Sequence, residues 1–311
     1  MIARIQQSGT LALLIFAAGW AAFFTYRDSY ALAAAGALLT LFGYGFYLAA
    51  EFGLLLLFGA DGANERPARS QLLRAWGGEF LCAPLVFCWR QPFRSRAEPD
   101  FVLPTVRGQR GVVLVHGFFC NRGLWNPWMR ALRARGIPFV AVNLEPPFAS
   151  IDDYARIIEV AAARIEAATG ETPVIVAHSM GGLAVRGWLA RFDAVKRIHR
   201  VVTIASPHRG TWLARFGHTR NATQMRQAST WLCGLGKLEC AQGPARFICY
   251  YGNCDNIVFP ASSAMLTGAD NRHLDATAHV QMVYHPDVLK AVLEWLEPAK
   301  PPLEPRTAPF S

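Results

Sequence analysis

A serine in a turn of small residues is the first feature of this sequence that could do chemistry. Ser179 lies in the run Ala177-His178-Ser179-Met180-Gly181-Gly182, directly after the apolar stretch PVIV and before LAVRGWLARF, which has a helical pattern. A nucleophile on a sharp strand-to-helix turn needs small neighbours, because its backbone is strained and the strand and helix approach closely. A serine held in this way is suited to attack an acyl carbon. We therefore predict that Ser179 is a nucleophile.

A carboxylate and a histidine follow the serine along the chain. Asp255 comes just past the apolar run RFICYYGN, and a short predicted strand over residues 275–280 leads to His279. A histidine can take the serine proton as general base, and a carboxylate orients the imidazole and stabilises its charged form. We predict His279 as the base and Asp255 as the acid. The alternatives are His285 for the base and Asp270 or Asp275 for the acid.

Five pieces of the sequence resemble the α/β-hydrolase superfamily, specifically its bacterial lipase- and esterase-like members, over about residues 110–297. They are HGF at 116, AHSMGG at 177, ASPHRGT at 205, DNIV at 255 and AHVQMVYHPDV at 278. The resemblance implies the chain order serine, acid, histidine for the triad. The strand-to-helix turn that carries the serine is called the nucleophile elbow, and its common pattern is G-x-S-x-G. This chain departs from the pattern at Ala177, which still supplies a small side chain.

The resemblance also implies where an oxyanion would bind. Acyl transfer places negative charge on the former carbonyl oxygen, which two preorganised backbone N–H groups stabilise. The run GVVLV ends in His116-Gly117-Phe118-Phe119, at the position of one such donor. We expect Phe118 and Met180 to supply the two N–H groups. We expect His116 to shape the loop and not to transfer protons.

Short apolar runs alternate with helical patterns along the second part of the chain. Ser150 can cap the helix that follows it and Gly170 can close it, and a last helix is expected from about Pro286 to Leu296. Apolar strands alternating with helices indicate an α/β fold with a mostly parallel sheet covered on both faces. The five predicted strands are residues 111–117, 138–144, 173–179, 200–206 and 246–253.

A segment after the fourth run has the composition of a cap. Residues 212–237 carry Leu213, Phe216, Met225, Trp231 and Leu232 among polar residues. The similar stretch in lipases leads into a lid, so we expect a lid near residues 208–245 that covers an acyl pocket. An ordinary pair of surface helices is the alternative.

Two apolar runs precede these motifs. Residues 10–26 carry no charge, and Glu51 is the only charged residue in residues 31–57. A membrane-spanning helix needs about 20 mainly apolar residues, with roughly 17 at the short end. We predict two transmembrane helices that form a membrane anchor over residues 1–60. For the first run a secretory signal segment is the alternative, because a short basic start precedes it and Ala17-Ala18-Gly19 resembles a weak cleavage site.

The positions of the arginines predict an orientation. Arg4 precedes the first run, Arg27 alone lies between the runs, and three arginines at 66, 69 and 74 follow the second. Because basic residues favour the cytoplasmic side, both ends of the anchor should be cytoplasmic. We expect a bacterial inner membrane location with a cytoplasmic catalytic domain. Seven cysteines at no framework spacing fit a reducing compartment, and a Cys233–Cys240 bridge is the alternative for an external domain.

The remaining segments complete the predicted organisation. Residues 61–109 should form an interfacial helix and a linker, or alternatively a helix packed on the catalytic domain of residues 110–297. Residues 298–311 carry too many prolines for helix or sheet and should be disordered. Since every predicted catalytic group follows residue 110, we expect a chain that starts near Pro99 to keep hydrolysing soluble esters.

Composition narrows the classes of ligand. The net charge of +9 is spread along the chain without the basic stripe of a nucleic-acid surface, so attraction to anionic lipid headgroups explains it better. No Lys-Ser or Lys-Thr follows the glycine-rich turn, which argues against a nucleotide loop. The histidines and cysteines lack metal-ligand spacing. We expect no cofactor, no metal and no nucleic acid, with membrane lipid and an acyl ester as partners.

Together these patterns predict a membrane-anchored serine hydrolase that cleaves carboxylic esters through an acyl-enzyme, with lipid or acyl esters as first choice. Thioesterase or amidase action uses the same machinery, so the fold does not choose among them. The alternative from another class is a membrane scaffold with a hydrolase-like domain that binds without turnover. The oligomeric state stays open.

Overall fold

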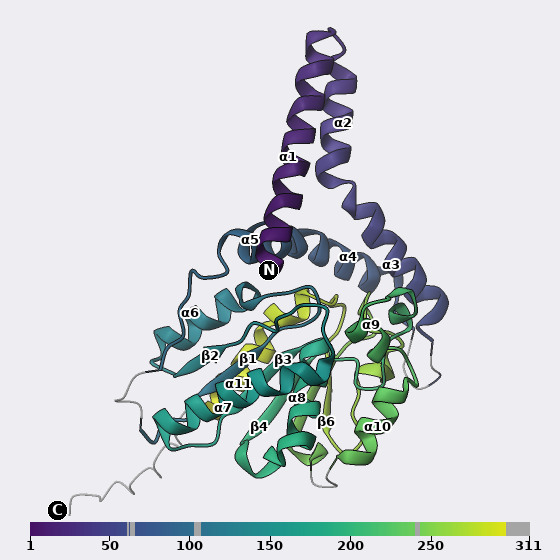
Figure 1. Cartoon of the computed structure of the whole chain (residues 1–311). Helices are drawn as coiled ribbons and strands as arrows, with labels where there is room; N and C mark the ends of the chain where they lie inside the picture. The colour runs from purple at the N-terminus through teal and green to yellow at the C-terminus, as the bar shows by residue number, and fades with distance from the viewer. Residues whose placement is uncertain (61, 63–65, 103–106, 240–242, 297–311) are drawn as a thin grey trace, which may run out of the picture.

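Six parallel strands form the central sheet of the computed structural model, which describes residues 1–60, 62, 66–102, 107–239 and 243–296. Their order across the sheet is β2-β1-β3-β4-β5-β6. The strands β3 and β4 are therefore central, and β1 lies beside β3 (Figure 1). The α/β fold with a parallel sheet is therefore confirmed. The strands are β1 (Val112–Val115), β2 (Phe139–Ala141), β3 (Val174–His178), β4 (Arg200–Ile204), β5 (Phe247–Tyr251) and β6 (Asp270–His273).

The sheet is buried on both faces because successive side chains of a strand point to opposite sides. Val113 and Ile175 pack with the helices α7 and α8 on one face. Val112 and Val174 pack with α6 and α11 on the other. The helices of this part of the chain are α6 (Asn126–Ala134), α7 (Ala155–Thr169), α8 (Met180–Phe192), α9 (Arg220–Gln224), α10 (Thr230–Leu238) and α11 (Pro286–Leu296).

The five strands expected from apolar runs are all present. The sixth, β6, was not predicted, because its sequence Asp-Asn-Arg-His is polar and it lies at the edge of the sheet. The strand predicted at residues 275–280 is absent, since β6 ends at His273 and His279 lies in a turn. Ser150 caps the short 3₁₀ turn that leads into α7, and Gly170 closes α7 with φ 74°.

The N-terminal helices stand apart from the sheet. The helices α1 (Ile2–Tyr26) and α2 (Tyr30–Phe42) lie side by side as a hairpin that projects from the rest of the chain, and α3 (Tyr44–Phe58) returns to it (Figure 1). Among the described residues, α1 is the one helix that is long and apolar enough by itself to cross a membrane. The pair α2 and α3 passes the same test together, although it bends by 46° at Gly43. The second apolar run is thus not one straight helix.

The returning helix α3 has two different sides. Leu48, Glu51, Phe52 and Leu55 are buried, at the three- and four-residue spacing of one helix face. Phe52 and Leu55 pack in a cluster with Cys254, Phe259 and Ala278 from the loops beyond the sheet. The opposite side leaves Phe46, Tyr47 and Leu57 exposed.

A long helical segment lies across the base of the hairpin (Figure 1). It consists of α4 (Arg69–Pro84), the π-helical turn η1 (Leu85–Arg90) and α5 (Gln91–Phe93). Its inner face buries Leu72, Ala75 and Glu79. Its outer face exposes Leu73, Leu81, Leu85 and Trp89, which follow one another at multiples of four residues. The contacts of α3 and α4 with the catalytic domain therefore cross the domain boundaries that the sequence predicts at residues 60 and 109. The predicted tail, residues 298–311, lies outside the described residues.

Candidate active site

Ser179 stands at the turn between β3 and α8 with φ 53° and ψ −128°. A residue other than glycine rarely adopts a positive φ, so the surrounding packing must hold this conformation. Small neighbours make that packing possible. A Cβ atom on Gly181 would come within 2.6 Å of the His116 carbonyl oxygen, and one on Gly182 within 2.3 Å of the Ser206 hydroxyl. The elbow predicted from the sequence is therefore sterically required to carry glycine at these positions.

The three predicted triad residues lie together at the carboxyl edge of the sheet. The Ser179 Oγ is 3.1 Å from His279 Nε2. On the other side of the ring, His279 Nδ1 is 3.0 Å from Asp255 Oδ1 and 3.1 Å from Oδ2. The residues are 7%, 5% and 1% exposed, respectively. This chain of hydrogen bonds can carry a proton from the serine hydroxyl to the imidazole.

The surroundings of His279 favour its charged form. Burial lowers the pKa of the imidazole, but the carboxylate of Asp255 and the charges of Glu79 and Glu51 outweigh this effect, so the pKa lies above its ordinary value. Asp255 is itself fixed, because the N–H groups of Ile257 and Val258 donate to its Oδ1 at 2.9 and 2.8 Å. The ring that would receive the serine proton is thus both oriented and stabilised as a cation.

The two expected oxyanion donors flank the serine. Met180 begins α8 directly after Ser179, and Phe118 lies in the loop after β1. That loop is close to the elbow, since a Cβ on Gly117 would come within 2.8 Å of the Ser179 Cβ. Within the described residues, no hydrogen bond uses the N–H of Phe118 or of Met180. Both groups are therefore available to an oxygen atom of a substrate.

The loop after β1 is shaped by His116, as expected. Its Nδ1 donates to the Gly117 carbonyl at 2.9 Å, and its Nε2 accepts the N–H of Leu144 at 3.0 Å. Burial lowers the pKa of His116 to about 4. The ring is therefore neutral, with the one tautomer that satisfies both bonds, and it has no contact with Ser179 that would serve proton transfer.

The alternative triad residues have partners elsewhere. Asp270 pairs with Arg272 at 2.7 Å, and Asp275 accepts the Gln71 amide. His285 precedes the first turn of α11, where its Nδ1 accepts the N–H of Asp287 at 3.4 Å. The structure brings none of the three into hydrogen-bond contact with Ser179 or with the other predicted triad residues.

Two buried carboxylates near His279 received no role from the sequence. Glu79 on α4 accepts the N–H groups of Val280 and Gln281, each at 3.0 Å. Glu51 on α3 accepts the Asn256 Nδ2 at 2.7 Å, and Asn256 Oδ1 accepts the N–H of His279 at 3.2 Å. For Glu51 a signal was present, because a lone ionisable residue in an apolar run usually has a function. Glu79 had no comparable signal, since charged residues surround it in the sequence.

The segment expected to form a lid is a 3₁₀ turn, η5 (Trp212–Phe216), followed by α9 and α10. Its residues Met225 and Leu232 are buried, whereas Phe216 is exposed. Trp212 stacks on Phe58 of α3 with ring centroids 4.1 Å apart, so this segment also meets the N-terminal helices. Residues 240–242 of the predicted lid, and with them Cys240 of the alternative disulfide, lie outside the described residues.

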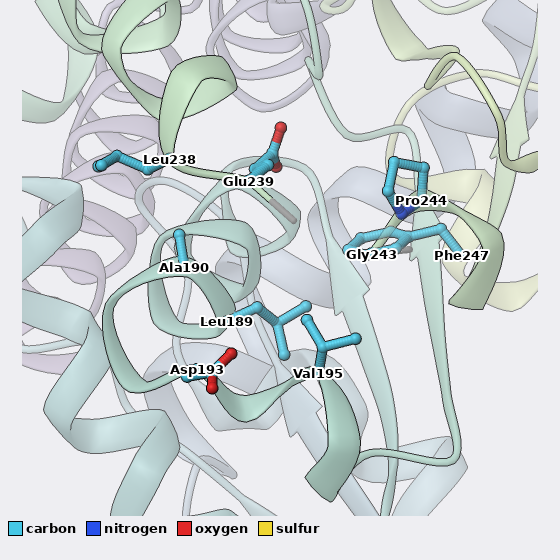
Figure 2. A pocket seen from close by; sticks show the side chains of 9 residues that line it. All are labelled: Leu189, Ala190, Asp193, Val195, Leu238, Glu239, Gly243, Pro244 and Phe247. Carbon is cyan, nitrogen blue, oxygen red and sulfur yellow. The ribbon is translucent and has the colours of Figure 1, made fainter. Parts of the chain in front are cut away.

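A small pocket at the end of this segment does not belong to the triad. It has a volume of about 40 Å³ and lies between the end of α8 and the turn before β5, lined by Leu189, Val195, Glu239 and Phe247 among others (Figure 2). None of its lining residues is a predicted site residue, and its volume suits a water molecule better than an acyl chain. Within the described part of the chain, no group of three or more metal-ligating side chains converges.

A parallel sheet with a serine at the strand-to-helix turn and a histidine and carboxylate at the same edge defines the α/β-hydrolase class of folds. The chain belongs to the alpha/beta hydrolase family, whose family model matches residues 112–307. No curated protein sequence matches the chain.

Solved structures show the same fold at low sequence identity. Aspergillus fumigatus lipase B aligns with a TM-score of 0.56 and 21% identity, over 65% of this chain and 57% of the lipase. The mature form of Bacillus licheniformis lipase BlEst2 aligns with a TM-score of 0.53 and 15% identity, over 61% of this chain and 92% of the lipase. At these low identities, the likenesses concern the fold alone. Glu51 and Glu79 precede the residues that the family model matches.

Proposed function

We propose that the chain is a membrane-anchored serine hydrolase that cleaves carboxylic esters, with lipid or other acyl esters as substrates. The observation that carries this proposal is the chain of hydrogen bonds from Ser179 through His279 to Asp255. It is supported by the two free N–H groups beside the serine and by lipases among the structures with the same fold.

In the proposed reaction, the Ser179 oxygen attacks the ester carbon while His279 Nε2 takes the hydroxyl proton. The N–H groups of Phe118 and Met180 stabilise the oxyanion of the tetrahedral intermediate. Its collapse breaks the carbon–oxygen bond to the alcohol, which leaves with the proton from His279, and an acyl-enzyme remains. Water then attacks the acyl carbon as His279 takes its proton, and the acid is released with Ser179 restored. Asp255 keeps the imidazole in the required tautomer and orientation throughout.

A fluorophosphonate probe tests this function, because it reacts with an activated serine and not with an ordinary one. We expect the native protein to be labelled at Ser179, with the site located by mass spectrometry. Ser179→Ala and heat-denatured wild type are the controls and should stay unlabelled. A native protein that is not labelled, and that hydrolyses no ester, would support the non-catalytic scaffold instead.

The proposed membrane attachment uses the helical hairpin and the outer face of α4. In α1, only 6% of the most apolar 18-residue window is buried, and the side chains of Leu14, Ile15 and Phe16 are exposed although α2 lies beside this helix. The exposed leucines and Trp89 on α4 and η1 lie at the base of the hairpin, where an amphipathic helix would meet headgroups. We propose a bacterial inner membrane location with the catalytic domain in the cytoplasm.

This location is tested by fractionation and proteolysis. The full chain should remain with the membrane after carbonate washing, and it should float with vesicles on a density gradient. In spheroplasts, protease added from outside should spare the catalytic domain, whereas lysis should expose it. Release by carbonate would contradict anchoring, and digestion in intact spheroplasts would contradict the cytoplasmic orientation.

A further inference from the structure

Two carboxylates from the N-terminal helices reach the loop that carries His279. Glu79 comes from α4 and Glu51 from α3, and they are 2% and 5% exposed. Both precede residue 112, where the family match begins, so they are not part of the segment that defines the family. Burying a carboxylate is costly unless hydrogen bonds compensate, so such groups need a specific explanation.

Glu79 holds the residues that directly follow His279. Its two carboxylate oxygens accept the N–H groups of Val280 and Gln281, one each. Gly78 also lies against this loop, and a Cβ there would come within 2.4 Å of the end of the Gln281 side chain, which would have to move. Two consecutive backbone N–H groups bound by one carboxylate fix both the position and the direction of the peptide chain beside the imidazole.

Glu51 holds His279 itself through one intermediate. Asn256 is 1% exposed, and its amide donates to Glu51 while its oxygen accepts the His279 N–H. Asn256 also directly follows Asp255. Glu51 therefore sets the orientation of the Asn256 amide in which both hydrogen bonds form. In this orientation Asn256 connects Asp255, its neighbour in the sequence, to His279.

The same carboxylates act on the charge of the imidazole. The groups that face His279 are Asp255 from the loop after β5, Glu51 from α3, Glu79 from α4 and the ring of His178 from the elbow. Burial raises the pKa of Glu79 to about 7, against the opposing effects of its two backbone hydrogen bonds and of His279. An ionised Glu79 therefore favours the imidazolium, and a protonated one does not.

We propose that Glu51 and Glu79 are positioning residues of the active site, which hold the His279 loop from the N-terminal helices and set the charge around the imidazole. The inference rests on the proposed function, because it takes His279 as the general base. It makes α3 and α4 a working part of the catalytic machinery as well as a connection to the membrane.

The test compares full-length variants with a soluble p-nitrophenyl ester. Glu79→Gln keeps the size of the side chain but sets an NH₂ group against one of the two N–H donors and removes the charge. Glu51→Ala removes the acceptor for Asn256, whereas Glu51→Gln keeps an oxygen that can accept the same bond. Glu294→Gln is the matched control, since Glu294 is exposed on α11 and pairs with Lys290 at 3.9 Å.

We expect Glu79→Gln and Glu51→Ala to lower kcat roughly 100-fold, the effect of misplacing a catalytic group by about 1 Å, with little change in KM. Glu51→Gln should recover most of the activity that Glu51→Ala loses. In Glu79→Gln the acid limb of kcat/KM should move to lower pH, because removing a negative charge lowers the pKa of His279. A merely structural role would not move that limb. Glu294→Gln should match wild type in all three measurements.

Several results would overturn the inference. One is a folded Glu79→Gln and a folded Glu51→Ala with wild-type kcat and acid limb. Another is loss of the folded state in both, seen by circular dichroism, which would assign the carboxylates to folding. If one variant does not fold, the other decides. Ser179→Ala separates the two proposals: wild-type activity there overturns the proposed function, whereas an inactive Ser179→Ala beside fully active glutamate variants overturns this inference alone.

Discussion

At the scale of single residues, the site depends on side chains whose states are set by their neighbours. His279 would be a poor base if it were buried without a charge, because burial alone lowers the pKa of an imidazole. The carboxylate of Asp255 reverses this effect. The neutral form of His279 can accept the serine proton, whereas the protonated form cannot. Activity should therefore fall as the pH falls through the raised pKa of His279.

A first prediction concerns the acid of the triad. Asp255→Asn should lower kcat roughly 10⁴-fold, because the amide favours the wrong imidazole tautomer. It also removes the negative charge that raises the pKa of His279, so the residual activity should persist to lower pH than that of wild type. The pH profile of kcat/KM measures both effects. Turnover close to wild type would point instead to Asp270 or Asp275.

A second prediction separates the two candidate bases. His279→Ala should cost roughly 10⁶-fold in kcat, as loss of a triad member does in comparable enzymes. His285→Ala should leave kcat within a few-fold of wild type, because His285 contacts the first turn of α11 and not Ser179. Steady-state kinetics of both variants decide the matter, with circular dichroism as the check on folding. The opposite ranking would transfer the role of base to His285.

At the scale of elements, the N-terminal helices also reach the loop with the proposed oxyanion donor. Gln6 of α1 is buried, and its Nε2 donates to the Phe119 carbonyl at 3.1 Å. Gln91 of α5 accepts the N–H of Asn121 at 2.9 Å. Phe119 has φ 54°, an unfavourable conformation for a residue with a side chain, so these bonds help to hold the loop beside Ser179.

A third prediction follows for these two glutamines. Gln6→Ala and Gln91→Ala should each lower kcat roughly 10-fold, less than the 10²- to 10³-fold loss when an oxyanion donor itself is removed. The control is Gln7→Ala, because Gln7 lies on the same helix but donates to the Pro92 carbonyl instead. Rates with a soluble ester measure the effect. Equal rates for all three variants and wild type would show that the loop does not need α1 and α5.

A fourth prediction concerns the outer face of α4 and η1. Leu81→Glu and Trp89→Glu place charges on exposed positions that the proposal puts at the membrane surface. Hydrolysis of long-chain lipid in vesicles should fall, whereas hydrolysis of a soluble ester should stay at the wild-type rate. The ratio of the two activities is the measured quantity. An unchanged ratio would argue against a lipid-facing role for this helix.

At the scale of the whole molecule, the N-terminal helices and the catalytic domain are not independent units. Phe52 and Leu55 of α3 share a buried cluster with residues beside Asp255 and His279. Glu51 of α3 and Glu79 of α4 connect to the His279 loop, and Gln6 of α1 connects to the Phe119 loop. These contacts change the expectation, drawn from the sequence, that a chain starting near Pro99 would keep its activity on soluble esters.

A fifth prediction replaces that expectation. A chain that starts at Pro99 should lose soluble-ester hydrolysis by roughly 100-fold or more, because the His279 and Phe119 loops lose their partners. Circular dichroism must first show that the shortened chain is folded, and fluorophosphonate labelling reports whether Ser179 is still activated. A folded short chain with full activity would show that the helices serve only for attachment.

The sequence by itself determined those features of the fold that a local pattern of residues controls. Apolar runs predicted the five strands β1 to β5, Ser150 and Gly170 marked the ends of the helical segment that contains α7, and small residues around Ser179 marked a tight turn. These features depend on neighbours along the chain, so the order of the residues reveals them. The polar edge strand β6 lacks such a pattern and was missed.

The tertiary structure alone decided which distant groups meet. The sequence left His279 and His285 as alternatives, and only the fold brings the ring of His279 between Ser179 and Asp255. It likewise brings Glu51 and Glu79 to a loop about 200 residues further along the chain, with sequence separations of 205 to Asn256 and 201 to Val280. No local pattern encodes such contacts, because they arise from how α3 and α4 pack across the edge of the sheet.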